Sequence, residues 1–343
     1  MRVPLPAAMI TMSSAMRLPS NDKTSIIGRP DCVGVASRRD PASSPAGADG
    51  NFGAARRALA GLLLLCLTLL SGCSLLRLTY PQVPTIAYWW LDAYVDFTTA
   101  QSPRVQEQLA EWLRWHRSTQ LVDYAALLQR ARTEVLAEAT PAQACRWYDE
   151  LAARLVVAYE QALPAAADAA LALTSAQMEH IQHKFDKSNA EFRDDFLQPA
   201  PEVRLKESVK RTVDRAETLY GRLDEAQRER VARAVAASPF DPALWLAERQ
   251  ARQVDLLQTL RRLQAERATN AQMQAALRML AERAQNSPRP AYRAYQQRLK
   301  QFNCELAAKV HNATTPAQRQ AAADTLKGWE TDIRALAAEP PAR

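Results

Sequence analysis

The sequence predicts an all-α protein, and three observations lead to that prediction. From Cys73 onward the remaining 271 residues contain only two glycines, Gly221 and Gly328. Hairpins, β-bulges and phosphate-binding loops draw on glycine because it accepts a positive φ, so a β-rich fold or a nucleotide-cradling loop is disfavoured. The same part of the chain is dominated by Ala, Leu, Gln, Glu and Arg, which have high helix propensity. The third observation is a helix-start pattern that recurs along the chain.

The residues before Cys73 match the pattern of an export signal. Two arginines at positions 56 and 57 precede an apolar run over 58–70. A cationic end followed by a short apolar core and small residues is typical of a cleaved secretory signal. A retained transmembrane anchor is the alternative, but it needs roughly 20 apolar residues. We therefore expect 56–72 to be a signal peptide.

The end of that segment, Leu70-Ser71-Gly72-Cys73, resembles a bacterial lipobox. The resemblance implies that diacylglycerol is attached to the Cys73 thiol, that cleavage falls between Gly72 and Cys73, and that acyl chains such as palmitate anchor the mature protein. By the same resemblance, Ser74 implies a location in the outer membrane, facing the periplasm. No other cofactor is expected, and membrane lipid is the first expected partner.

We divide the chain into five segments. Residues 1–55 are rich in Pro, Ser, Gly and Asp without helical or strand periodicity, so they are either disordered or an extension upstream of the true start. After the signal peptide, 73–84 is expected to be a lipid-anchored tether and 85–338 a single helical domain. Residues 339–343 are expected to be a disordered tail.

The net charge of the whole chain is higher than that of the mature chain, so it does not indicate which partners the mature chain binds. Residues 1–72 hold eight of the 44 Lys and Arg and four of the 37 Asp and Glu, which leaves 36 and 33 and a net charge of +3 after cleavage. Strong basicity is the electrostatic footprint of nucleic-acid binding. The mature chain lacks it, so we exclude nucleic acid as a partner.

The recurring helix start places a capping oxygen three residues before a glutamine. In such a capping box the first side chain accepts from the N3 amide while the glutamine reaches back, which satisfies two unpaired donors. The five starts are Thr140-Pro141-Ala142-Gln143, Thr174-Ser175-Ala176-Gln177, Asp224-Glu225-Ala226-Gln227, Thr269-Asn270-Ala271-Gln272 and Thr315-Pro316-Ala317-Gln318.

Other starts and stops complete an elongated bundle of about 10–11 helices. Ser102-Pro103, Asp241-Pro242 and Ser287-Pro288 are read as helix starts, and Gly221 as a helix stop. The predicted helices are 85–97, 103–117, 119–138, 141–162, 175–197, 202–220, 225–236, 242–267, 270–285, 289–311 and 316–337. Their unequal spacing argues against a regular solenoid.

Two sets of segments each resemble a known family. Tyr88-Trp89-Trp90-Leu91-Asp92-Ala93-Tyr94-Val95-Asp96, with Trp112-Leu113-Arg114-Trp115-His116-Arg117 and Tyr124-Ala125-Ala126-Leu127-Leu128, resembles proteobacterial outer-membrane lipoproteins that carry a domain of unknown function. That resemblance implies a helical body and no particular activity. Leu173-Thr174-Ser175-Ala176-Gln177, echoed by Leu223-Asp224-Glu225-Ala226-Gln227, is similar to the Leu-Thr-x-x-Gln signature of the Spy and CpxP periplasmic proteins, which implies a cradle for unfolded chains.

The aromatic helix 85–97 has two interpretations. Trp90, Tyr94 and Phe97 share one helical face, which predicts a core, while Asp92 and Asp96 share another. If the next helix is antiparallel, the carboxylates are expected to form ion pairs; the candidate partners are Arg114 and Arg117. Alternatively, part of this helix rests at a lipid interface, where Trp and Tyr are favoured.

Three further groups of residues are candidates for sites. Cys145 and Cys304 are free to pair in an oxidising compartment, although the sequence does not show that they are close. His180 and His183 lie three apart, but a solvated polar face explains them equally well, so no metal site is predicted. A basic segment over 204–215 is either the wet side of an amphipathic helix or a contact for anionic lipid.

No catalytic residue is assigned. No serine after Cys73 lies in a glycine elbow, while a catalytic carboxylate pair depends on three-dimensional position and stays open. The expected function is a lipid-anchored structural or interaction module with an envelope protein as partner. The alternative is a periplasmic chaperone that binds unfolded clients.

Overall fold

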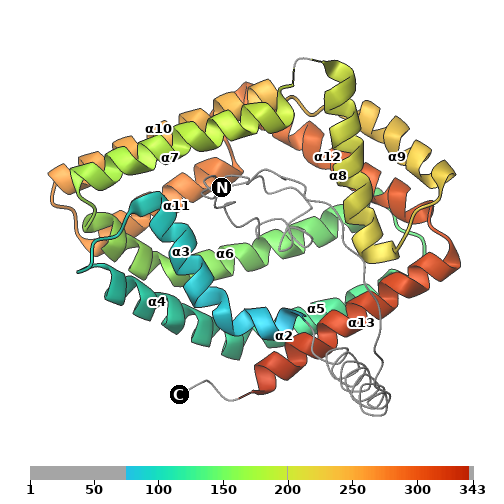
Figure 1. Ribbon diagram of the computed structural model, residues 1–343, viewed down its shortest axis with the longest axis horizontal. Helices are drawn as coiled ribbons and strands as arrows, with labels where there is room; N and C mark the ends of the chain where they lie inside the picture. The colour runs from blue at the N-terminus through green and yellow to red at the C-terminus, as the bar shows by residue number, and fades with distance from the viewer. Residues whose placement is uncertain (1–74, 199, 340–343) are drawn as a thin grey trace, which may run out of the picture. The chain divides into compact units, whose positions relative to one another are not determined.

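The computed structural model describes residues 75–198 and 200–339 (Figure 1). The elements in order are α2 Leu75–Thr79, η2 Tyr80–Gln82, α3 Val83–Val95, α4 Ser102–Trp115, η3 His116–Gln120, α5 Leu121–Glu134, α6 Pro141–Leu171, α7 Ser175–Phe196, α8 Pro201–Tyr220, α9 Glu225–Ala236, α10 Pro242–Ala265, α11 Asn270–Gln285, α12 Pro290–Asn312 and α13 Pro316–Ala338. No strand occurs in these ranges, which confirms the all-α prediction. The predictions for 1–55, 56–72, Gly72, Cys73 and 340–343 lie outside the described residues.

All five predicted capping boxes are present and begin α6, α7, α9, α11 and α13. A sixth was missed: Gln101 N donates to Thr98 Oγ1 over 3.3 Å while Thr98 N donates to Gln101 Oε1 over 3.0 Å. It precedes α4, so Ser102 is the first residue of that helix and not its cap. The prediction that Asp241 caps α10 is confirmed, since its carboxylate accepts from the backbone of Ala243 over 2.9 Å.

Three predicted boundaries are wrong. α4, η3 and α5 form one continuous helical run from Ser102 to Glu134, in which a π-helical segment replaces the expected break. α12 begins after Ser287-Pro288, at Pro290. α6 continues past Pro164 to Leu171 although proline removes a backbone donor. Leu163 and Ala167, both fully buried, hold the helix against its neighbours on either side of Pro164, and that burial offsets the lost hydrogen bond.

The described part of the predicted tether over 73–84 is helical and packed against the body. The chain is helical from Leu75, and Tyr80 is only 6% exposed. Tyr80 packs with Leu121 and Leu336, and the partly buried Leu76 lies against the same cluster. Burial of these apolar side chains stabilises the segment by more than the conformational entropy that it loses on ordering. The segment therefore joins the helical body.

In the part of the chain that the structure describes, the apolar core is divided into four clusters. One joins the end of α6 with α7, α10 and α11, and a second joins the end of α7 with α10 and α12. A third lies between α8, α9 and α12, and the fourth joins η2 with α5 and α13. Each helix pair is therefore stabilised mainly by its own neighbours.

One arrangement of helices occurs twice. α3 packs on α7 in the first half as α8 packs on α13 in the second, and α7 lies along α10 as α13 lies along α5 (Figure 1). In the first half, α3 is followed by the capping box that begins α4, and the capping box of α7 lies beside it. In the second half, α8 is followed by the capping box of α9, and the capping box of α13 lies beside it. Gly221, with φ 73°, ends α8 as predicted, because only glycine takes this backbone conformation readily.

In each half, the two capping boxes that lie side by side are joined by a pair of glutamines, one from each box. Gln177 Nε2 donates to Gln101 Oε1 over 2.8 Å and to the Asp96 carbonyl over 2.9 Å. Gln227 and Gln318 form the same pair in the second half, at 2.7 and 3.0 Å. The glutamine oxygen serves the capping box, which leaves its amide nitrogen free to bond across to the other helix. We call these two pairs the glutamine clasps.

Candidate functional site

The N-terminal end of the described chain is docked by polar as well as apolar contacts. Arg77 lies 3.1 Å from Glu339 near the end of α13. The Tyr80 hydroxyl lies 2.9 Å from His116 Nδ1, at the start of the π-helical segment. Helices α2 and η2 are therefore tied to both α13 and the α4–α5 run.

His116 lies in an aromatic cage. Its ring stacks on Trp112 at 4.9 Å and meets the edge of Tyr124 at 5.3 Å. Burial lowers the pKa of His116 to about 4 and raises the pKa of Tyr80 well above its usual value. The imidazole is consequently neutral at pH 7, which suits a hydrogen bond to tyrosine. Such π-helical segments are frequent at functional sites, and this one begins at a histidine that is hydrogen-bonded to a tyrosine hydroxyl.

A second tyrosine–histidine pair lies in the other half of the fold. Tyr220 Oη is 2.8 Å from His311 Nδ1, while His311 Nε2 is 2.7 Å from the Ala137 carbonyl. Burial lowers the pKa of His311 and raises the pKa of Tyr220 to about 12. Both ring nitrogens are occupied by structural partners, so this histidine fixes α8 and the α5–α6 connection to α12.

The predicted ion pairs between Asp92 or Asp96 and the two arginines are wrong. Arg114 is 3.9 Å from Glu111 on its own helix, and Arg117 is 2.8 Å from Glu339. Asp92 instead accepts a hydrogen bond from the Phe97 amide at the end of α3, over 2.9 Å. Asp96 takes a left-handed backbone conformation with φ 57°, and its carbonyl accepts from Gln177. Chain reversal after α3 places both carboxylates away from the arginines.

Cys145 on α6 and Cys304 on α12 are joined by a disulfide, with their Cα atoms 5.2 Å apart. Cys304 is 2% exposed, so the bond lies between the packed helices. His180 faces the Ala93 carbonyl at 3.3 Å and His183 is exposed. Within the described residues no three His, Cys, Asp or Glu side chains form a metal-binding group.

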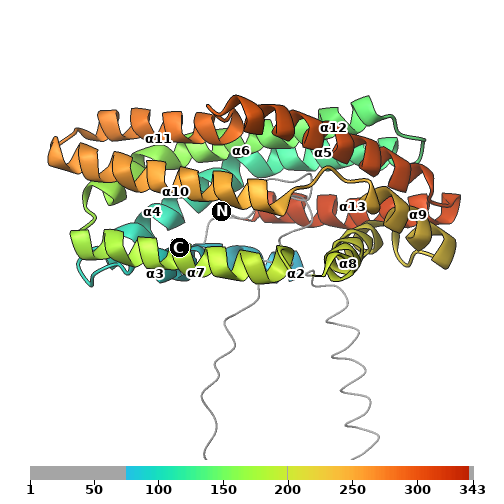
Figure 2. The same ribbon diagram turned by 90° about the horizontal axis from the view of Figure 1, so that it is seen from above.

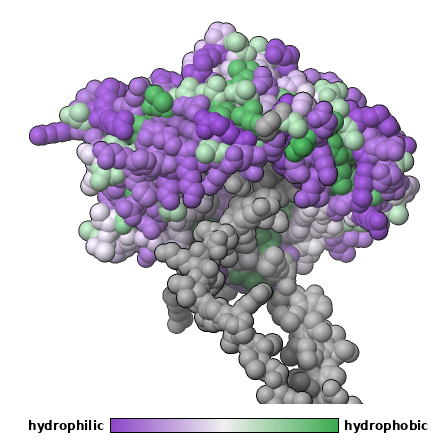
Figure 3. Space-filling view, turned by 45° about the horizontal axis from the view of Figure 1, so that its top comes forward, coloured by the Kyte–Doolittle hydropathy of each residue, from purple (hydrophilic) through white to green (hydrophobic). Residues whose placement is uncertain are grey.

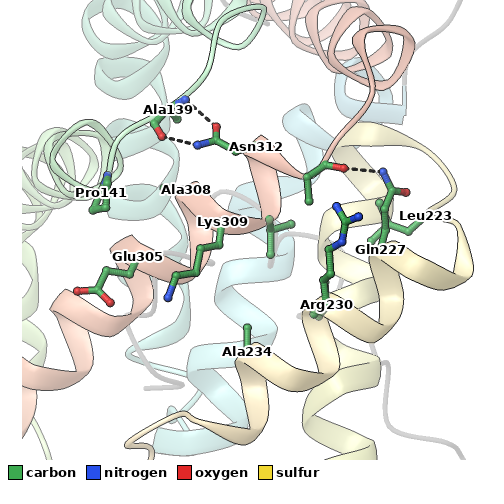
Figure 4. A pocket seen from close by; sticks show the side chains of 13 residues that line it. Ala139, Pro141, Leu223, Gln227, Arg230, Ala234, Glu305, Ala308, Lys309 and Asn312 are labelled. Atoms are coloured by element: carbon green, nitrogen blue, oxygen red, sulfur yellow. Dashed lines mark hydrogen bonds between the residues drawn. The ribbon is translucent and has the colours of Figure 1, made fainter.

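A groove of about 680 Å³ lies between α9 and α12 (Figure 4). Its apolar floor includes Leu223, Val231 and Ala308. Arg230 reaches it from α9, and Lys309 from α12. The other lining residues are Ala139, Pro141, Gln227, Ala234, Glu305, Val310, Asn312 and Ala313.

Hydrogen bonds fix the walls of this groove. Asn312 Nδ2 donates to the Ala139 carbonyl over 2.9 Å, and the Ala139 amide donates to Asn312 Oδ1 over 2.8 Å. Gln227 Nε2 donates to the Ala313 carbonyl over 2.9 Å. Arg230 and Lys309, by contrast, are exposed and make no ion pair within the described residues. A rigid apolar groove with two unpaired cations is suited to an amphipathic, acidic partner.

Neither the groove nor the tyrosine–histidine pairs were predicted from the sequence. Arg230 and Lys309 are 79 positions apart and carry no shared motif. The one usable signal was the glutamine at the third position of each capping box, since Gln227 fixes the groove edge. The rest depends on which helices meet.

The fold and these sites define a class: an all-α protein with a fixed helical groove and buried structural histidines. No helix in the described ranges has both the length and the apolar character to cross a bilayer. The chain belongs to a family of unknown function, DUF6279, whose model matches residues 93–293. No curated protein matches the chain, and neither does any solved structure.

Proposed function

We propose that this protein is a lipid-anchored module of the cell envelope, held at the periplasmic face of the outer membrane through Cys73, which recruits another envelope protein. One observation carries the proposal: an arginine pair at 56–57, an apolar run over 58–70 and the lipobox-like Leu70-Ser71-Gly72-Cys73 follow one another in the order of a lipoprotein signal. A cleavage before Cys73 would leave every described helix intact.

The anchor is tested on the mature N-terminal peptide. Mass spectrometry of protein purified from membranes is expected to show chain starting at Cys73 with a diacylglyceryl group. Cys73→Ser is expected to abolish both cleavage and acylation. Cys66→Ser, in the same apolar segment, is the matched control and is expected to process normally. Normal maturation of Cys73→Ser would refute the anchor.

The groove between α9 and α12 is the proposed partner site. Its unpaired cations, Arg230 and Lys309, favour an acidic segment whose apolar side chains reach the floor. Crosslinking in membranes followed by purification is expected to return one reproducible protein. Arg230→Glu with Lys309→Glu is expected to lose it, whereas Lys327→Glu, an exposed lysine on α13, is expected to retain it. Equal recovery by all variants would exclude the groove.

A chaperone is the second candidate, and one observation favours it. Leu155, Val156 and Val157 on α6 are consecutive aliphatic residues that are 54%, 39% and 46% exposed. Exposed apolar surface of this kind binds unfolded chains when it is continuous. On the face shown in Figure 3, however, apolar residues form separate patches between hydrophilic ones. Suppression of the aggregation of a denatured protein, lost in Val156→Glu, would support this candidate; no suppression would reject it.

A further inference from the structure

Helix α3 exposes an apolar stripe. Its exposed positions are Thr85, Ile86, Trp89, Trp90 and Ala93, which recur every three or four residues and therefore lie on one face. Trp89 is 61% exposed, Trp90 53% and Ile86 37%. A surface helix normally turns charged residues to water. Here the exposed face carries none, and the interpretation of Trp90 as a core residue is wrong.

The rest of α3 is already used in packing. Tyr88 donates a hydrogen bond to Ser102 Oγ over 2.8 Å, which faces it toward α4. Tyr94 lies against Phe185 of α7 at 6.4 Å between ring centroids. Asp92 is the one charged residue of the helix, and the Phe97 amide occupies its carboxylate. Ile86, Trp89 and Trp90, which we call the α3 stripe, are thus not used in packing α3 against the other helices.

The neighbouring elements extend the same character. α2, which leads into α3 through η2, exposes 58% of Leu78. α2, α3, α7 and α8 lie in one layer of the described fold (Figure 2). On α8, Val203 is 45% exposed, while Lys206 and Lys210 are exposed and make no ion pair within the described residues. Apolar groups with flanking cations complement a bilayer that contains anionic lipid.

We infer that the α3 stripe lies in the headgroup region of the bilayer that holds the lipid anchor, with Trp89 and Trp90 inserted at the interface. The inference rests on the proposed acylation of Cys73. Only Ser74 separates that cysteine from α2, and two residue steps span at most about 7 Å. The body is consequently held against the lipid surface at its α2–α3 end. Tryptophan has an apolar body and a polar N–H, which suits this environment.

The test uses full-length protein purified from membranes and reconstituted into phosphatidylethanolamine–phosphatidylglycerol vesicles, with and without brominated lipid. Bromine quenches tryptophans that contact the acyl region. Two of the seven tryptophans are in the stripe. Brominated lipid is expected to quench part of the wild-type emission, and Trp89→Phe with Trp90→Phe is expected to lose that quenched part. Trp147→Phe, whose ring is covered by Arg130 at 4.9 Å, is the matched control and is expected to keep it.

A second variant tests contact without removing the reporter. Ile86→Glu places a charge on the stripe and is expected to abolish quenching of Trp89 and Trp90. Val254→Glu, on α10 and outside the α2–α3–α7–α8 layer, is expected to leave quenching unchanged. Equal quenching in wild type and the double Phe variant would overturn the inference. The inference would also be overturned if bromine did not quench the tryptophan emission but a protein crosslinked at position 89 altered it.

The two proposals fail in different ways. An acylated Cys73 with unquenched stripe tryptophans would overturn the stripe and leave the anchor. An unmodified Cys73 with quenched tryptophans would overturn the anchor and leave the stripe, since the vesicle contact is read directly at positions 89 and 90.

Discussion

The glutamine clasp between the starts of α4 and α7 is a sharp test of how this fold is stabilised. Gln177 is 4% exposed. Its Oε1 accepts from the Thr174 amide over 3.0 Å, and its Nε2 donates to Gln101 over 2.8 Å and to the Asp96 carbonyl over 2.9 Å. Gln177→Ala removes all of these bonds and leaves partly buried groups without these partners.

The size of the effect follows from that inventory. Each lost hydrogen bond costs about 0.5–1.5 kcal/mol, so we expect Gln177→Ala to lower the free energy of unfolding by about 2–4 kcal/mol. Gln272 is the matched control because it is exposed and completes a capping box without a clasp. Gln272→Ala is expected to cost about 0.5–1 kcal/mol, the usual contribution of a cap.

A charge-changing variant separates the cap from the clasp. Gln177→Glu keeps an acceptor for the Thr174 amide but removes both donors and directs a carboxylate at the Asp96 carbonyl. We expect it to destabilise at least as much as Gln177→Ala. The assay is urea unfolding followed by circular dichroism at 222 nm. Equal destabilisation by the Gln177→Ala and Gln272→Ala variants would refute the idea that the clasp contributes beyond its capping box.

Three other predictions concern the rest of the fold. Replacing Cys145 and Cys304 together by Ser is expected to lower the free energy of unfolding by about 2–5 kcal/mol, because the closed loop is long; urea unfolding of the oxidised wild type is the comparison. Asp241→Ala is expected to cost about 0.5–2 kcal/mol through the lost cap of α10, and Asp241→Asn, measured in the same way, much less. The pKa of His116 is about 4 in the folded state, below its ordinary value. The stability that the neutral imidazole contributes is therefore fully present above about pH 6.5 and is lost as pH falls toward 4. His116→Gln is expected to weaken this dependence when urea midpoints are compared at several pH values; an unchanged slope would contradict the assignment.

The helix starts were predictable because their chemistry is local. A capping box closes within four residues, so Thr140 to Gln143 and its four counterparts specify their own geometry. Gly221 was predictable for the same reason. The predicted end of α6 at residue 162 was wrong, because burial of Leu163 and Ala167 carries the helix onward to Leu171.

The sites were less predictable because they join distant segments. Gln101 and Gln177 are 76 residues apart, and Arg230 and Lys309 reach one groove from different helices. Helical periodicity put Trp90, Tyr94 and Phe97 on one face but did not tell whether that face was buried, and Trp90 is 53% exposed. That choice was made by packing against α4 and α7.

The sequence by itself determined the helical class and the capping boxes that begin five helices, because composition and short-range hydrogen bonding act within a few residues. The tertiary structure alone decided that residues 75–84 join the body, that the capping glutamines clasp in pairs and that the tryptophans of α3 face outward. Those features depend on which apolar faces meet. The free energy of burying one helix face against another depends on both helices, so neither segment of sequence predicts it alone.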